Sequence, residues 1–422
     1  MKSLRRRLLD RLGPGLITGA ADDDPSGIAT YSQAGAQFGF GMLWSVLLTT
    51  PLMVGIQIVS ARIGLVTGHG IAHNLRQHYP RWLLYAIVGL LLVANTINIA
   101  ADVAAMGEAL QLIIGGPEHG HAVIFGVVVV LLQIFLPYQR LAPLLKWLTL
   151  ALFAYVAVLF TVRVPWQDVV FATLFPPIEL SAGYMMMLVA VLGTTISPYL
   201  FFWQAAQEVE EIRMHADREP LYRYPEHARK HLRRVKVDTY VGMIFSNGVA
   251  FCIMLTAAVT LHTAGISNIE TSAQAALALR PLAGEFAFTL FALGIIGTGL
   301  LALPVLAGSA AYAVAEAMNW PTGHNLKLHE AKGFYSIIAF ATAVGVALDF
   351  TSIDPIKALV WSAVINGIVA VPVMAVMMLL STKTAIMGRF TVHGPLRFAG
   401  WLATAAMAAA ATAMGISLFG AA

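Results

Sequence analysis

Apolar runs, separated by short polar connections, follow one another along almost the whole chain. A helix that crosses a lipid bilayer needs roughly 20 mostly apolar residues. The pattern therefore predicts an all-α polytopic membrane protein with about eleven membrane-spanning helices. Their expected bounds are about 13–37, 41–64, 82–112, 120–137, 142–164, 182–209, 236–263, 284–318, 332–349, 356–381 and 394–419.

Two of the expected spans contain helix breakers in the middle of an apolar run. The first span carries Asp24-Pro25-Ser26-Gly27, and the sixth carries Pro198 within the stretch GTTISPYLFFWQ. Proline removes a helix hydrogen bond and clashes with the preceding turn. Backbone groups freed in this way survive at membrane depth only where they line a cavity or are buried in protein.

The two breaks lie five spans apart, and this spacing predicts an inverted repeat. With five helices in each repeat, the second repeat enters the membrane from the opposite side, as in transporters whose substrate site lies between discontinuous helices. We expect a single transmembrane domain over 1–422, with repeats at about 13–164 and 182–381 and an extra helix at 394–419.

Composition strengthens the membrane assignment. Of the 422 residues, 58% are hydrophobic and 11% are charged, whereas soluble domains average about 25% charged residues. Cys252 is the only cysteine, so no intramolecular disulfide can form. We expect the lipid bilayer and a transported ion as partners, with no nucleic acid and no cofactor.

The positions of lysine and arginine predict the orientation. Suppose that the amino terminus lies in the cytoplasm and that successive spans alternate in direction. Of the lysines and arginines in the connections and at the span ends, only Arg163, Arg280 and Lys357 then fall on the outer side of the membrane. Cytoplasmic loops of membrane proteins carry the excess of basic residues, so this arrangement is favoured. The basic segment MKSLRRRLLDRLG lacks a cleavable pattern and is interpreted as a cytoplasmic anchor. We expect a multi-pass protein of a bacterial inner membrane.

Several stretches resemble one family of transporters. The segment GPGLITGAADDDPSGIATYSQAGAQFGFGMLW resembles the first helix of the Nramp metal-ion transporters, whose mark is Asp-Pro-Gly-Asn. TGHGIAHNLRQHYP is similar to that family's loop after the second helix, and AADVAAMG, LGTTISPYLF and VDTYVGMIFSNG are similar to its third, sixth and seventh helices. The resemblance implies a LeuT-like five-plus-five inverted repeat and transport of divalent cations.

The chain departs from the Nramp pattern at the positions that the resemblance assigns to ion binding. Asp24 matches the family's aspartate, but Gly27 stands in place of its asparagine, and Ser197 stands in place of its methionine. Asp102 matches the aspartate of the third helix, and Asn366 lies near a glutamine of the tenth. Three further family residues are replaced, a glutamate by Ala105 and two histidines by Tyr199 and Gln204.

These departures change the expected chemistry. A thioether is a soft ligand that favours transition metals, whereas Mg²⁺ prefers oxygen ligands and keeps several waters. Ser197 leaves a site of oxygen atoms, and Gly27 makes room for water; both match the Nramp-related magnesium transporter branch. The residues expected to form the metal site are Asp24, Gly27, Thr194, Ser197, Asp102 and Asn366.

The predicted function is secondary transport of Mg²⁺, and also of Mn²⁺, by alternating access. We expect the ion to be partly hydrated and the transport to proceed without strong proton coupling. Two alternatives stay open at this point: a proton-coupled Mn²⁺ or Fe²⁺ transporter of the Nramp type, and a cation-sensing receptor. A sodium-coupled carrier of organic solutes is disfavoured, because Asp24 at the break points to a cationic substrate.

No enzymatic function is expected. An intramembrane enzyme would need a metal motif or a nucleophile with its base, and the spans contain no HExxH, no GxSxG and no paired histidines. His69 and His73 have the i, i+4 spacing of metal ligands, but they follow the second span, where a surface helix is the simpler interpretation.

Other polar residues within the spans have two interpretations each. Asp22 and Asp23 either line an inner vestibule or end a helix. Asn95, Asn98 and Asp102 share one helix face, which predicts a wet pathway or hydrogen bonds between helices. Ser362 and Asn366 also share a face, and they either line the site or form hydrogen bonds between helices. Glu108 either guards the outer mouth of the pathway or lies at the membrane interface. Asp238 fits the inner exit, and we interpret a last group as a solvated helix end: Glu208, Glu210 and Glu211.

Overall fold

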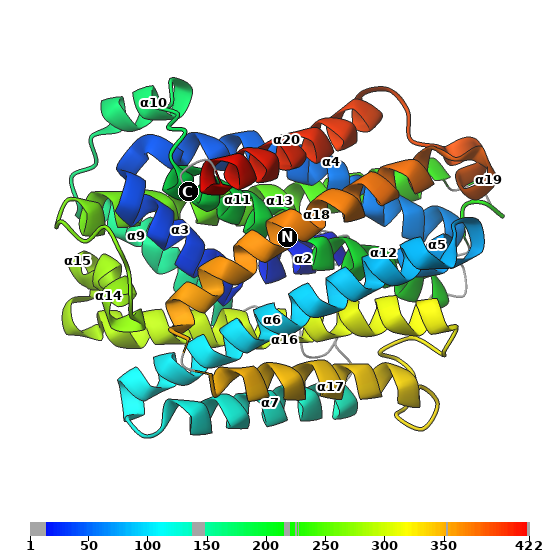
Figure 1. The fold of residues 1–422 in the computed structure, drawn as a ribbon, viewed down its shortest axis with the longest axis horizontal. Coiled ribbons are helices and arrows are strands. Elements are labelled where there is room, and N and C mark those ends of the chain that lie inside the picture. Colours follow the sequence, from blue (N-terminus) through cyan, green and yellow to red (C-terminus); the bar gives the residue numbers. More distant parts are fainter. Residues whose placement is uncertain are drawn as a thin grey trace, which may run out of the picture.

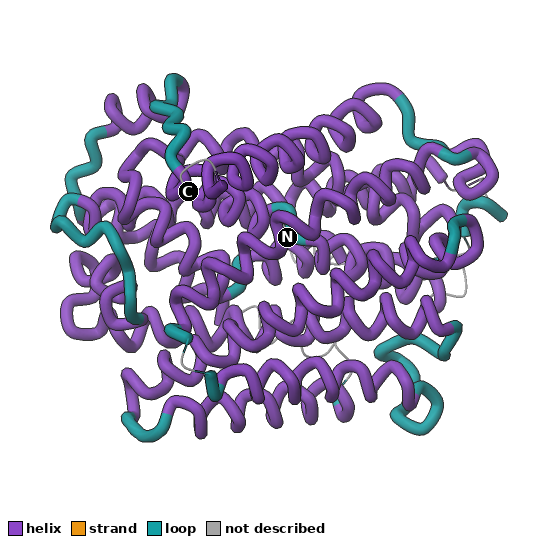
Figure 2. Tube along the Cα trace, viewed as in Figure 1, coloured by secondary structure: helices purple, strands orange, loops and turns teal. Residues whose placement is uncertain are grey.

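The computed structural model describes residues 14–136, 148–214, 220–223, 226, 228–351 and 353–419. Within these ranges all the regular elements are helices, joined mostly by short loops (Figures 1 and 2). The helices of the first half are α2 (Pro14–Asp22), α3 (Pro25–Phe38), α4 (Leu43–Thr67), α5 (Ile71–His78), α6 (Arg81–Ile114), α7 (Glu118–Phe135), α9 (Phe153–Thr161) and α10 (Trp166–Leu174). Those of the second half are α11 (Ala182–Thr195), α12 (Pro198–Met214), α13 (Ala228–Ala257), α14 (Ser272–Ala276), α15 (Arg280–Ala283), α16 (Ala287–Met318), α17 (Lys332–Asp349), α18 (Pro355–Thr382), α19 (Thr384–Met387) and α20 (Gly394–Phe419).

The number of spans differs from the expected eleven for identifiable reasons. In the described part of the chain, nine helical segments are long and apolar enough to cross a membrane, or ten if the bent pair Leu150–Thr161 and Trp166–Leu174 is one span. One of the nine, Pro25–Thr67, joins most of the first expected span to the second. Gly39, with φ of 56°, lies at the junction of α3 and the turn that leads into α4. Part of the expected span 142–164 lies outside the described residues.

Both predicted helix breaks are present. α2 ends at Asp22 and α3 begins at Pro25, while α11 ends at Thr195 and α12 begins at Pro198. Proline is accepted at the first position of a helix because its missing N–H would have no partner there. Each proline therefore starts a new half-helix instead of continuing the old one.

Small residues bring the broken helices close to their neighbours. A Cβ atom added to Gly19 of α2 would lie 2.4 Å from the carbonyl oxygen of Gly242 of α13. In the same way, a Cβ atom on Gly193 of α11 would lie 2.1 Å from the carbonyl oxygen of Ala363 of α18. Small residues at helix contacts allow this approach in membrane proteins, and here they fix both breaks in the interior.

The remaining helices surround this centre. α6 packs along α16, and α7 and α17 lie side by side along one flank of the molecule (Figure 1). Many large apolar side chains stay exposed on the outside, such as Trp82, which is 70% exposed. Exposed apolar side chains at this frequency are expected where the surrounding solvent is lipid.

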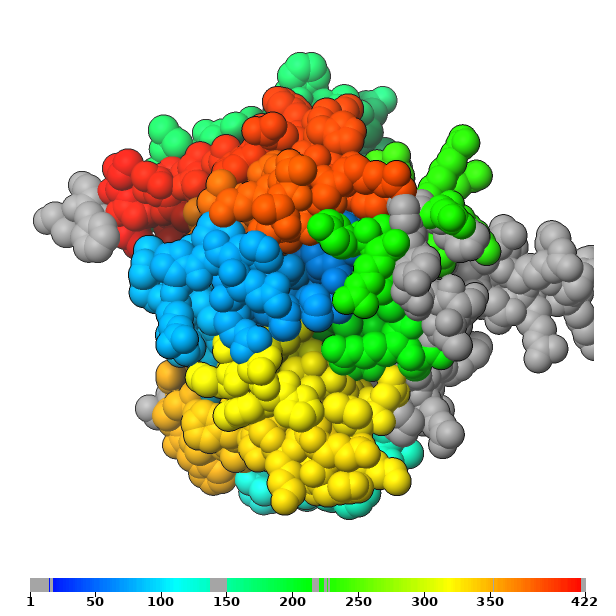
Figure 3. Space-filling model, turned by 90° about the vertical axis from the view of Figure 1, so that its right-hand side faces the viewer, coloured from blue at the N-terminus to red at the C-terminus, as the bar shows by residue number. Residues whose placement is uncertain are grey.

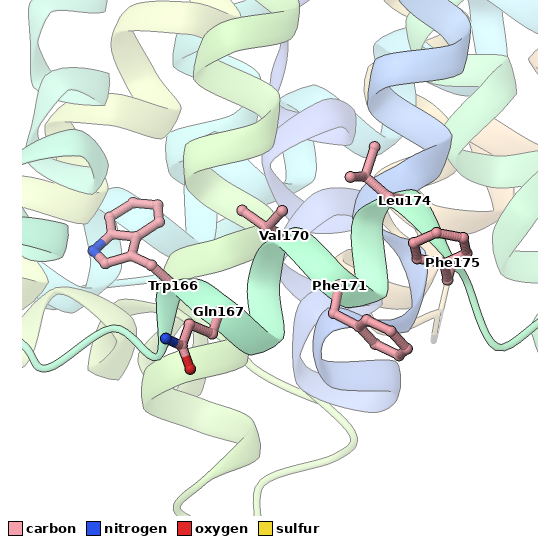
Figure 4. Close-up of a pocket in the computed structure, with 6 residues that line it drawn as sticks. All are labelled: Trp166, Gln167, Val170, Phe171, Leu174 and Phe175. Carbon is pink, nitrogen blue, oxygen red and sulfur yellow. The ribbon is translucent and has the colours of Figure 1, made fainter.

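A hollow on the outside of the molecule lies along α10 (Figure 4). Five of its six lining side chains are apolar, and the single polar one is Gln167. The hollow lacks the carboxylate and carbonyl donors that a hard cation requires. Such donors lie in the interior instead, around the two helix breaks.

Candidate metal-ion site

Asp24 occupies the break in the first span, where it caps the second half-helix. Its Oδ1 atom accepts hydrogen bonds from the backbone N–H of Gly27 at 2.7 Å and from the Ser26 hydroxyl at 2.8 Å. The first turn of a helix has N–H groups without partners, and a capping aspartate satisfies them. The side chain is only 1% exposed, so the local sequence Asp-Pro-Ser-Gly places one carboxylate in the protein interior.

The third expected span, α6, brings a second carboxylate to Asp24. The Asn98 Nδ2 atom donates to Asp24 Oδ2 at 3.2 Å and to Asp102 Oδ2 at 3.1 Å. The Asn366 Nδ2 atom of α18 donates to Asn98 Oδ1 at 2.7 Å. Three predicted site residues, Asp24, Asp102 and Asn366, therefore belong to one hydrogen-bonded group, and Asn98 joins them.

Gly27 and Thr194 meet beside the Asp24 carboxylate. A Cβ atom on Gly27 would lie 3.2 Å from Thr194 Oγ1 and 3.4 Å from Asp24 Oδ1. The first turn of α3 and the last turn of α11 thus approach each other at this point. Any larger residue in place of Gly27 would crowd the space between the two breaks.

Ser197 lies in the second break, between α11 and α12, and is 1% exposed. Its hydroxyl donates to the carbonyl oxygens of Gly193 at 2.7 Å and Thr194 at 2.9 Å. These hydrogen bonds stay within the residue's own segment, and the hydroxyl oxygen keeps its lone pairs. The predicted contact of Ser197 with an ion stays a prediction.

Asp22 and Asp23 point away from the solvent and toward α13. The Ser246 hydroxyl lies 2.5 Å from Asp22 Oδ2 and 3.2 Å from Asp23 Oδ1. A hydroxyl has one hydrogen atom and can satisfy only one of two carboxylates fully. Asp22 Oδ1 has no hydrogen-bond partner, and both side chains are at most 2% exposed. Ser246, which is not among the predicted site residues, lies on the face of α13 that supports the first break.

The carboxylates around the first break form an excess of buried acceptors. Asp102 Oδ1 and Asn366 Oδ1 are also buried without hydrogen-bond partners. Buried charges are costly unless they are paired. In the described part of the chain, no group of three or more His, Cys, Asp or Glu side chains is arranged to hold an ion. A cation here would be bound by one or two carboxylates together with amide, hydroxyl and backbone oxygens.

The comparison with protein families decides the assignment. The model of the family described as natural resistance-associated macrophage protein-like, Nramp, matches residues 15–417. This chain belongs to the Nramp family. The match extends over almost the entire sequence and includes both helix breaks.

Two curated bacterial proteins align with most of this Nramp chain. The divalent metal cation transporter MntH of Klebsiella pneumoniae is 26% identical over 410 residues, which make up 95% of this chain and 92% of the relative. The MntH of Yersinia pestis is 30% identical over 306 residues, or 71% of each chain.

Solved structures show the fold of the Nramp chain. A manganese transporter of Eremococcus coleocola, in complex with an aromatic bis-isothiourea substituted compound, matches 100% of this chain and 90% of its own at 17% identity, with a TM-score of 0.77. Mhp1, a nucleobase-cation-symport-1 family transporter in a closed conformation, matches 96% of this chain and 92% of its own at 13% identity, with a TM-score of 0.57. The fold is the LeuT-like inverted repeat that the sequence predicted.

Other polar residues of the spans form hydrogen bonds between helices or within one helix. Asn95 donates to the Leu306 carbonyl oxygen at 2.9 Å and to the Ser309 hydroxyl at 2.8 Å, both on α16. The Ser362 hydroxyl donates to the carbonyl oxygen of Leu359 in its own helix. Asn95 therefore forms hydrogen bonds between helices, whereas the bond of Ser362 stays within α18.

Two acidic residues cap helices. Glu108 accepts hydrogen bonds from the backbone N–H and the hydroxyl of Ser272, at the start of α14. It therefore connects α6 to α14. Asp238 accepts a hydrogen bond from the backbone N–H of Gly15 at 2.7 Å, so it caps the start of α2.

The expectation of a solvated helix end at Glu208, Glu210 and Glu211 is wrong for the first two residues. Glu208 is fully buried and pairs with Arg234 at 2.7 Å. Glu210 is 3% exposed and accepts hydrogen bonds from Tyr312 and Asn325. The acidic run resembles a surface pattern, but neighbouring helices supply partners that a one-dimensional pattern does not reveal.

His69 lies between α4 and α5, and His73 lies in α5, the helix at the end of the molecule that faces the viewer in Figure 3. Their rings stack with centroids 3.9 Å apart and line a hollow of about 300 Å³ with Arg213, Glu316 and Trp320. Burial, together with nearby positive charges, lowers the pKa of His73 to about 4. The helix predicted here is present as α5, and the residues form no cluster of metal ligands among the described side chains.

Proposed function

We propose that this chain is a secondary transporter of divalent metal cations that prefers Mg²⁺, accepts Mn²⁺ and works by alternating access. The observation that carries the proposal is the group of buried, oxygen-bearing side chains at the first break, formed by Asp24, Asp102 and Asn366 through Asn98. Divalent cations with hard character take carboxylate, carbonyl and water oxygens as ligands.

The polarity of the half-helices supports a cationic substrate. α2 and α11 both end at a break, so their last carbonyl groups lie there, whereas the opposite N–H end of α3 is capped by the Asp24 carboxylate. Unwound carbonyl groups and half-helix C-termini are the features that coordinate cations in inverted-repeat transporters. The Asp22 carbonyl oxygen lies 3.4 Å from the position of a Cβ atom on Gly27, on the side of that glycine where Thr194 also lies.

The preference for Mg²⁺ rests on Gly27 and Ser197. At these positions the chain lacks the asparagine and the thioether that the resemblance assigns to the main Nramp family, and in this it resembles the Nramp-related magnesium transporter branch. Loss of the thioether removes the ligand that favours transition metals. Gly27 puts no side chain beside Asp24 and Thr194, so none competes there with the water shell that Mg²⁺ tends to keep.

Weak proton coupling is part of the proposal. Tyr199 and Gln204 stand where the family has histidines, the side chains that titrate most readily near neutral pH. The Tyr199 hydroxyl donates to the Ala21 carbonyl oxygen at 3.3 Å, and Gln204 accepts a hydrogen bond from Thr18 at 2.7 Å. Both residues connect α12 to α2, a role that needs no proton transfer.

The proposed architecture has repeats at about 13–164 and 182–381, an extra helix at 394–419 and a cytoplasmic amino terminus in a bacterial inner membrane. A cysteine at Gln167, in a background with Cys252→Ser, tests the orientation. We expect a membrane-impermeant thiol reagent to label it from the outside of intact cells. Labelling only after the membrane is opened would contradict the proposed topology.

Uptake by the purified protein in sealed proteoliposomes tests the function. We expect influx of Mg²⁺ and Mn²⁺, weaker influx of Ca²⁺, and little change when a pH gradient is imposed. Uptake of Mn²⁺ that depends strongly on the gradient would favour the proton-coupled Nramp alternative. Binding of the ions without any influx would favour the cation-sensing receptor.

A further inference from the structure

Asn98 lies between two buried carboxylates and has hydrogen bonds on all sides of its amide. Its Nδ2 atom carries two hydrogen atoms, one for Asp24 Oδ2 at 3.2 Å and one for Asp102 Oδ2 at 3.1 Å. The side chain is fully buried. An amide nitrogen has two donors and no more, so Asn98 is fully committed to these two carboxylates.

The orientation of this amide is fixed by α18. Asn98 Oδ1 accepts a hydrogen bond from Asn366 Nδ2 at 2.7 Å. If the Asn98 amide turned over, its oxygen would face both carboxylates and its NH₂ group would face the NH₂ group of Asn366. All three contacts would then be repulsive, so a single orientation is compatible with these neighbours.

Asp24 is consequently held on both of its oxygen atoms. Gly27 and Ser26 occupy Oδ1, and Asn98 occupies one lone pair of Oδ2. A carboxylate oxygen accepts more than one contact, so Oδ2 still has a lone pair for an ion. Asp102 keeps Oδ1 without a partner. The amide thus lines up two carboxylates that would otherwise repel each other in a poorly solvated interior.

We propose that Asn98 is a positioning residue for the transported ion: it holds Asp24 and Asp102 as a pair and sets which of their oxygens face the substrate. The inference rests on the proposed function and deepens it. Asn98 acts through the two carboxylates and needs no direct contact with the ion.

Asn95, on the same helix, provides a matched control. It is also a fully buried asparagine, but its amide donates to the neutral oxygens of Leu306 and Ser309 on α16. The Asn95 variant therefore measures the effect of losing a buried amide that only joins two helices and contacts no carboxylate. A difference between the two variants in substrate affinity isolates the effect on the carboxylates.

The experiment measures the concentration dependence of Mg²⁺ influx in proteoliposomes for wild type, Asn98→Ala and Asn95→Ala. Hydrogen bonds to charged groups contribute enough that we expect the apparent KM of Asn98→Ala to rise about 10- to 100-fold, with a smaller change in maximal rate. Asn95→Ala is expected to lower the unfolding temperature while its KM stays close to that of wild type.

Two further variants separate positioning from folding. Asn98→Ser keeps one donor and should give a KM between wild type and Asn98→Ala. Asn98→Asp keeps the size, loses both donors and adds a third carboxylate, so transport should be lost in protein that still elutes as a folded monodisperse species. If Asn98→Ala does not fold, the KM of Asn98→Ser decides the matter.

An unchanged KM in Asn98→Ala or Asn98→Ser would overturn the inference, as would equal changes of KM in the Asn98 and Asn95 variants. Both results leave wild-type influx intact and so leave the proposed function standing. Absence of influx in wild type would instead refute the proposed function. The two failures are therefore distinguishable in one set of vesicles.

Discussion

Both helix breaks leave backbone groups that need hydrogen-bond partners, but the first break supplies a carboxylate and the second a neutral hydroxyl. At the first break, Asp24 caps the N-terminus of α3, and its carboxylate also reaches Asn98 on α6. At the second break, the Ser197 hydroxyl donates hydrogen bonds to the carbonyl oxygens of Gly193 and Thr194 at the end of α11. Freed backbone groups at membrane depth need partners in either case, but only the first break introduces negative charge.

This difference suggests a division of roles between the repeats. The first break supplies the charge that offsets the dehydration of a divalent ion, and its side chains depend on α6, α13 and α18 for their positions. The second break has no charged side chain, and the Ser197 hydroxyl bonds within its own segment. Its backbone and hydroxyl oxygens can therefore contact an ion without adding a general attraction for every cation. Affinity should therefore depend mainly on the charge at the first break, and discrimination between ions on Ser197 at the second break together with Gly27.

The largest effect is expected for Asp24→Asn. The substitution keeps the shape of the side chain and removes one negative charge from a site that has to compensate a doubly charged ion. Influx of both Mg²⁺ and Mn²⁺ in proteoliposomes should be almost abolished, while the folded protein persists. Ser197→Ala serves as the control at the neutral break and should keep measurable influx; wild-type rates in Asp24→Asn would show that the first break is not the site.

Exchanging Ser197 at the second break and Gly27 at the first should change ion preference. Ser197→Met introduces a soft ligand, and Gly27→Asn fills the space beside Thr194 and Asp24. We expect Mg²⁺ influx to fall more than that of Mn²⁺ or Cd²⁺, with a shift in discrimination of about 1–3 kcal/mol and non-additive effects in the double variant.

Competitive uptake of Mg²⁺ against Mn²⁺ and Cd²⁺ measures this shift. Gly27→Ala is the matched control, because it fills part of the space without offering a ligand. An unchanged preference in the double variant would place selectivity elsewhere, with Asp102 and Asn366 as the remaining polar groups around Asp24.

Removing the support of the first break on α13 should have a moderate effect. Ser246→Ala leaves Asp22 and Asp23 without their shared hydroxyl, and unsatisfied buried acceptors cost about 1–3 kcal/mol. Thermal unfolding in detergent should show a lower midpoint than that of Ser362→Ala, whose hydroxyl bonds only to its own helix. Equal midpoints would mean that α13 does not stabilise the break.

The smallest expected effect concerns the far end of the second broken helix. Trp203 of α12 contacts the buried His324 ring, with centroids 5.5 Å apart, and Tyr312 lies between His324 and Glu210. Burial lowers the pKa of His324 to about 4, whereas an unfolded histidine has a pKa of about 6.5. Between these values the unfolded chain binds more protons than the folded one.

Stability from His324 is therefore present above about pH 6.5 and is lost as the pH falls toward 4. Between about pH 7.5 and 5.5 the loss should be on the order of 1 kcal/mol. Unfolding midpoints at the two pH values measure it, and His324→Gln should reduce the difference. An unchanged difference in His324→Gln would contradict the assignment.

The sequence by itself determined the helical class, the membrane setting, the two breaks and the central aspartate. These features depend on signals contained in a few neighbouring residues: apolar runs of spanning length, proline within such a run, and a carboxylate directly before it. The resemblance of Asp24-Pro25-Ser26-Gly27 to a family mark added the class of substrate, and the family match agrees with it.

Only the tertiary structure decided which polar groups act together. Asn95 and Asn98 share a helix face in the sequence, yet one joins α16 and the other joins two carboxylates. Glu208 and Glu210 form part of an acidic run that resembles a surface, yet partners from other helices bury them. Such contacts depend on the rotation and depth at which helices pack, and no local window of sequence contains that information.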